Sequence, residues 1–99
     1  MAFDPVDYAQ RRLVPFLNAI LELLAETDEP EQEAFFLSIR RAIEAARHPD
    51  DLADPFIQLS MSAFLGFQFP SPVAMVLDQL LMHAQELTLV MSLEERELH

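Results

Sequence analysis

The sequence predicts an all-α domain, a compact bundle of four helices that self-associates. Three observations lead to this prediction. Glycine occurs once and proline 7 times, so tight hairpin turns that need positive φ are scarce. Several prolines directly follow a side chain that caps helices, the usual arrangement at a helix start. Apolar residues recur at helical spacing, and no run of alternating β-branched residues predicts a strand.

The length of 99 residues fits one domain, 1–99. A chain this short buries only roughly 60–65% of its unfolded surface, so its stability as an isolated monomer is modest. Disulfides, metals or oligomerisation usually add the missing stability. Because cysteine is absent, disulfides, thiolate metal sites and a cysteine nucleophile are excluded. The composition fits a reducing cytoplasm, which is the expected location.

The formal net charge is -11, and every basic side chain other than histidine is arginine. Such a chain repels phosphate backbones and anionic membrane surfaces, so we expect neither nucleic acid nor membrane as a partner. The same field favours basic proteins. We see no secretory signal at the start, and polar residues interrupt the most apolar stretches, so no membrane span is predicted.

The first helix is expected from about Pro5 to Ala25, capped by Asp4. Its apolar stripe consists of Val6, Ala9, Leu13, Phe16, Leu17, Ile20 and Leu24. Pro15 lies inside this helix, and the stripe stays in phase across it. We therefore expect a kink at Pro15, with a break into two helices as the alternative.

Two helices follow. One runs from about Pro30 to Arg47 and is clearly amphipathic. The next runs from about Pro55 to Leu65, with its start at Asp54-Pro55 and its end at Gly66. This third helix is apolar almost all round, which predicts burial on most of its sides.

The last helix is expected from Pro72 to roughly Leu93, or further into the charged tail. The residues on its predicted core face are Val73, Val76, Leu77, Leu80, Leu81, Ala84, Leu87 and Met91. A second apolar stripe lies nearly opposite and consists of Met75, Met82 and Leu89, spaced by sevens, together with Leu93.

This second stripe has two interpretations. Scattered apolar residues are common on protein surfaces. A contact surface for a partner helix is the alternative, which we favour because Asp78 and Glu86 are the only formal charges between residues 55 and 93. Self-association is the simplest form of such contact, since two-fold dimers are the commonest oligomers.

Phe67 and Phe69 lie in the link before the last helix and are further interface candidates. They would sit at the interface or at the rim of a pocket. Core filling is the alternative, and it applies equally to Met61 and Phe64.

Catalytic and metal chemistry is weakly represented. His83 and Glu86 are spaced i, i+3, so they can share a helix face and bind a metal, although an exposed polar pair is the simpler interpretation. No serine has the glycine context of a nucleophile, and one glycine cannot form a phosphate-binding loop. We expect neither a cofactor nor enzymatic activity.

The sequence therefore favours a non-enzymatic, homo-oligomeric helical interaction module whose acidic faces are free for a second, basic protein. The alternatives are an acidic inhibitor or antitoxin-type protein with a basic target, a metal-binding or small-ligand protein built on His83 and Glu86, and a cargo or secretion chaperone. An inhibitor predicts a monomer with salt-dependent affinity for its target.

Overall fold

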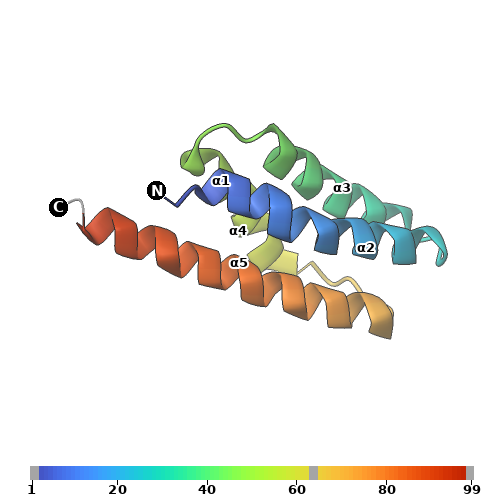
Figure 1. Ribbon diagram of the computed structural model, residues 1–99. Coiled ribbons are helices and arrows are strands. Elements are labelled where there is room, and N and C mark those ends of the chain that lie inside the picture. Colours follow the sequence, from blue (N-terminus) through green and yellow to red (C-terminus); the bar gives the residue numbers. More distant parts are fainter. Residues whose placement is uncertain (1–2, 63–64, 98–99) are drawn as a thin grey trace.

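The prolines of the sequence mark most of the helix starts in the fold. The computed structural model describes residues 3–62 and 65–97, with side chains of the last helix described as far as Leu93. Within these ranges the chain is a bundle of four helical segments without strands, which confirms the predicted fold class (Figure 1). In order, the elements are α1 (Pro5–Tyr8), the π-helical turn η1 (Ala9–Leu13), α2 (Val14–Ala25), α3 (Pro30–Ala45), the 3₁₀ helix η2 (Pro49–Leu52), α4 (Ala53–Met61) and α5 (Ser71–Glu97).

The first segment is helical without interruption from α1 through η1 to α2. The Asp4 carboxylate caps its start by accepting the Val6 N–H at 3.0 Å. Pro15 has no N–H to donate, and its ring crowds the preceding turn. That turn is widened into a π-helix, in which the N–H of Val14 bonds to the carbonyl of Ala9. The chain therefore passes Pro15 by a local change of helix type and does not break there.

The core is formed where α2 lies between α3 and α5 and contacts both (Figure 1). The predicted stripes supply it, since each contributes residues that are at most 8% exposed. These are Val6, Ala9, Leu13, Leu17, Ile20 and Leu24 in the first segment, Phe36, Ile39, Ile43 and Ala46 in and just after α3, and Val73, Leu77, Leu80, Ala84 and Leu87 in α5.

The third helical segment differs from its prediction in both bounds. It begins at Pro49 rather than Pro55, because His48 caps the 3₁₀ helix η2, which leads directly into α4. Pro55 is tolerated because it lies in the first turn of α4, where an N–H has no obligatory partner in the helix. α4 ends at Met61, before the predicted end at Leu65.

The prediction that the third helix is buried on most sides is also wrong. Leu59 is buried, but the side chains of Ile57 and Met61 are 57% and 49% exposed. α4 packs mainly against α3 and only along a short stretch against α5, so its outer side has no neighbour within the described chain. Phe64 lies outside the described residues.

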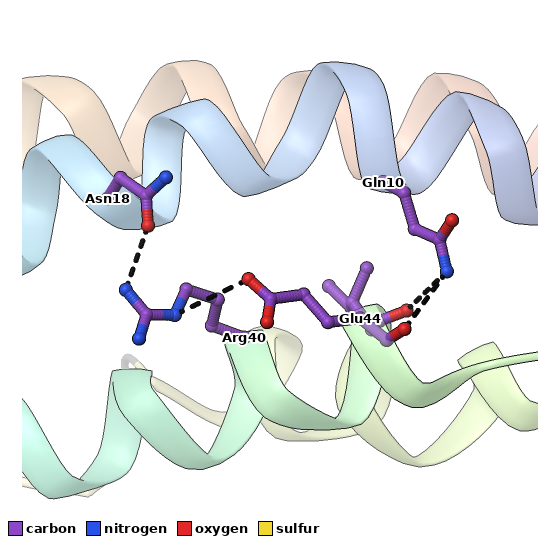
Figure 2. Close-up of polar contacts among 5 residues, drawn as sticks. Gln10, Asn18, Arg40 and Glu44 are labelled. Atoms are coloured by element: carbon purple, nitrogen blue, oxygen red, sulfur yellow. Dashed lines mark hydrogen bonds and ion pairs between the residues drawn. The ribbon is translucent and has the colours of Figure 1, made fainter.

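Polar side chains of the first segment hold α3 in place (Figure 2). The Gln10 Nε2 atom donates to carbonyl oxygens at the C-terminal end of α3, those of Ile43, Glu44 and Ala46, each at 3.2 Å. These carbonyls belong to a helix end, where no further turn supplies donors. Arg40 Nη1 donates to Asn18 Oδ1 at 2.9 Å, and Arg40 Nε lies 3.6 Å from Glu44 Oε1. The position of α3 is thus set by directional bonds as well as by apolar packing.

Candidate interaction surfaces

The second stripe of α5 points away from the bundle. Its side chains are the most consistently exposed apolar group on the helix: Met75 67%, Met82 58%, Leu89 62% and Leu93 50%. On the opposite side of the same helix Val73 and Leu80 are fully buried. With 100° between successive residues, the stripe lies roughly opposite that core face. The structure thus places all four predicted residues together on one surface.

This stripe is long and carries little charge. From Met75 to Leu93 it covers about 27 Å at 1.5 Å per residue. Asp78 and Glu86 are the only formal charges between residues 71 and 93, and both are exposed. The neighbouring Gln79 and Gln85 are neutral. The stripe is therefore a weakly charged surface on a chain with a net charge of -11.

A second apolar surface lies where α5 runs past the rest of the bundle (Figure 1). Leu87 is the last buried residue in the part of α5 whose side chains are described, and Val90 beyond it is 39% exposed. Beside these last turns, η2 and α4 form one wall of a groove of about 460 Å³. Its lining includes Leu52, Phe56, Ile57 and Met61 on that wall and Thr88 and Met91 on α5. A hollow of about 180 Å³ between α4 and α5 shares Phe56, Ser60 and Thr88 with it.

The groove has an acidic end. Asp50, Asp51 and Asp54 are the only charged residues in the range Pro49–Met61, and Asp50 lines the groove itself. The Asp51 carboxylate accepts the backbone N–H groups of Arg47 and His48 at 3.0 and 3.1 Å. These two bonds lower the pKa of Asp51 because they favour its charged form. They also fix the start of η2, and with it this end of the groove.

Phe67 and Phe69 pack against the N-terminal part of α3. Their ring centroids lie 5.6 Å from Phe35 and 5.8 Å from Phe36, respectively. Between them, the carbonyl of Gln68 accepts a bond from Gln32 Nε2 at 3.3 Å. Gln32 is buried in α3, a position that its polar side chain does not predict from the sequence. Both phenylalanines are half-buried, so the link contributes to intramolecular packing, and a contact with a partner through their accessible edges stays a prediction.

His83 and Glu86 lie side by side on α5, with His83 Nδ1 3.9 Å from Glu86 Oε2. The His83 ring stacks on Phe16, with 5.1 Å between ring centroids, and its Nδ1 atom is buried. Within the described residues no group of three or more His, Cys, Asp or Glu side chains is arranged to hold a metal ion. The pair alone offers two ligands, fewer than protein zinc sites use.

Among the described helices none has the length and apolar character needed to cross a membrane. Comparison with known proteins gives no relative from which a function can be transferred: no family model matches the chain, and no curated protein or solved structure is significantly similar to it.

Proposed function

We propose that this protein is a non-enzymatic helical interaction module that dimerises through the outward stripe of α5. The observation that carries the proposal is the exposure, between 50% and 67%, of Met75, Met82, Leu89 and Leu93 along one side of a single helix. A row of exposed apolar side chains along one side of a helix is typical of a protein contact. We place the dimer in a reducing compartment such as the cytoplasm, in keeping with the absence of cysteine.

The stripe is suited to antiparallel pairing about a two-fold axis at Met82. Met75 and Leu89 lie seven residues on either side of Met82, so each would face the other in the partner helix. Full burial of one such side chain contributes about 1.5–3 kcal/mol. The summed contribution of the stripe side chains of both copies is offset by an association cost of about 4–15 kcal/mol. We therefore expect a dissociation constant in the micromolar range or weaker. Methionine also adapts its shape to a facing helix.

Charge modulates this pairing. Asp78 and Glu86 lie four residues on either side of Met82. Antiparallel pairing therefore brings Asp78 of each copy to the same level as Glu86 of the other, where the two like charges repel. Salt screens that repulsion. The proposed dimer should thus become tighter as the salt concentration rises from about 0.01 to 0.5 M, the reverse of the salt dependence expected of a complex between this acidic chain and a basic protein.

Light scattering over a range of concentrations, at low and high salt, tests the proposal. The expected species at high concentration has twice the chain mass of 11.3 kDa. Met82→Glu should leave a folded monomer, because Met82 is 58% exposed and contributes little to the core. Ser38→Glu is the matched control, since it adds the same charge at an exposed position of α3 and should leave the dimer intact. A monomer at every concentration, or equal effects of the two substitutions, would rule out pairing through α5.

A further inference from the structure

We infer that the groove between α4 and the last turns of α5 binds a basic amphipathic helix of another protein. The groove lies on a different side of α5 from the stripe: Thr88 and Met91 line it, whereas Leu89 and Leu93 point away from it. The inference is therefore independent of self-association, and the two surfaces can be tested separately.

The first argument is the apolar character of the groove. Ile57 and Met61 lie one turn apart on the outer side of α4 and are 57% and 49% exposed although they line a concave surface. Leu59, on the opposite side of α4, is buried and anchors that helix to the bundle. The wall is thus held in place by the fold while its apolar outer side lacks a covering element among the described residues. A helix that presents apolar side chains at i, i+3, i+4 and i+7 fits such a groove.

The second argument is charge, which selects the kind of helix. Asp50 lines one end of the groove, Asp51 and Asp54 are close to it in the sequence, and no Lys or Arg occurs between residues 49 and 61. The whole chain has a net charge of -11, so a second copy would bring further negative charge to this end. A helix with lysine or arginine on its polar side instead forms complementary pairs with these carboxylates. Charge complementarity therefore favours a basic partner over a second copy of the chain.

The third argument is the ability of the groove to adapt. Met61 lies on the α4 wall and Met91 on the α5 wall, so a flexible thioether is present on each side. Methionine is common on surfaces that accept helices of different sequence, because its unbranched chain adjusts to the guest. The acidic end determines the orientation of the bound helix, whose basic end would lie nearest Asp50.

The five methionines of the chain allow a direct test by NMR of protein labelled with ¹³C at the methionine methyl groups. The probe is a 14-residue helical peptide of leucine and lysine with leucine at i, i+3, i+4 and i+7. Titration should shift the signals of Met61 and Met91, which line the groove, and leave those of Met75 and Met82 in place. The same peptide with glutamate in place of lysine should bind at least tenfold more weakly.

Substitutions identify the surface that the peptide occupies. Ile57→Gln should weaken binding of the lysine peptide about tenfold without unfolding the protein, since Ile57 is more than half exposed. Met75→Gln, a change on the stripe at a position that is 67% exposed, should not affect it. Asp50→Asn combined with Asp54→Asn should weaken binding and reduce its salt dependence.

Three results would overturn the inference: no saturable shift at Met61 and Met91, equal binding of the lysine and glutamate peptides, or shifts confined to Met75 and Met82. Dilution without peptide tests the dimer in the same spectrum, because dissociation should move Met75 and Met82 alone. Failure of the groove and failure of the dimer therefore give different patterns. Shifts at Met61 and Met91 on raising the protein concentration alone would show that a second copy occupies the groove.

Discussion

Helices α3 and α5 both pack against α2, but their outward sides differ in chemistry. The exposed residues of α3 include Glu31, Arg41 and Glu44, and it carries no exposed large hydrophobic side chain. The described part of α5 carries five, Met75, Met82, Leu89, Val90 and Leu93. The outer side of α3 is therefore polar and suited to contact with solvent. The outer side of α5 has the composition that led us to propose a contact with a second copy.

The two helices are also held by different forces. α3 receives hydrogen bonds from Gln10 and donates one to Asn18, so directional bonds fix its position along the axis of α2. Among the side chains that the structure describes, none forms a hydrogen bond or ion pair between α5 and another element. α5 is positioned by the fit of residues such as Leu80 and Leu87. One neighbour of α2 is thus fixed by polar contacts in addition to apolar packing, and the other by apolar packing without such contacts.

The largest expected effect is a difference in unfolding free energy between substitutions on the buried and the outward side of α5. Leu80→Ala should lower the free energy of unfolding by about 2–5 kcal/mol, because it leaves a cavity in the core. Leu89→Ala removes the same atoms from the outward stripe, where Leu89 is 62% exposed, and should change it by less than about 0.5 kcal/mol. Urea denaturation at a protein concentration low enough to keep the chain monomeric measures both. Equal losses at that dilution would mean that the stripe is already covered within one chain.

A smaller effect is expected where α3 is held by polar contacts. Gln10→Ala removes the donor to the carbonyls at the end of α3 and should cost about 1 kcal/mol in unfolding free energy. Arg12→Ala changes an exposed neighbour on the same turn and serves as the control, with an expected change below about 0.5 kcal/mol. Hydrogen exchange in the last turn of α3 should increase in Gln10→Ala only. A loss no greater than that of the control would show that α3, like α5, is positioned by packing alone.

The smallest effect depends on pH and concerns the connection from α3 to α4. The pKa of Asp51 is lowered from its ordinary value of 3.8, mainly by the N–H groups of Arg47 and His48. A lowered pKa in the folded state contributes stability that is present above the unfolded pKa and is lost as the pH falls through the folded value. Asp51→Asn should therefore lower the melting temperature slightly at pH 7, and the difference should vanish toward pH 2.

Asp50→Asn is the control for that measurement, because the Asp50 side chain is 89% exposed and accepts no backbone N–H. It should not alter the melting temperature at either pH. A difference between Asp51→Asn and the unmodified chain that persisted unchanged at pH 2 would show that shape, and not the charge of Asp51, fixes the start of η2.

The first, second and last helices and the buried face of each were predictable because they depend on local chemistry. Asp4 and the prolines at positions 5 and 30 mark starts that need only neighbouring residues. The spacing of Leu13, Leu17 and Ile20 defines a buried face whatever the partner helix is. The outward direction of the Met75 stripe followed from the same periodicity.

The groove was not predictable because it depends on the placement of α4. Sequence alone showed that Ile57 and Met61 are apolar, but their exposure results from the path of α4, which leaves one side open toward α5. The π-helical turn before Pro15 likewise depends on how the chain relieves a steric conflict. At the third segment, Pro55 resembled a helix start, and the His48 cap was missed because histidine rarely has that role.

The placement of stripe and groove on different sides of α5 determines the valency of the proposed assembly. A dimer closed through Met82 would leave one groove open on each copy, related by the two-fold axis. A protein with two basic helices would then meet the second groove at a high effective concentration once the first was filled. Dimerisation would in this way convert two weak sites into one bivalent receptor, whose avidity depends on the total concentration of the chain.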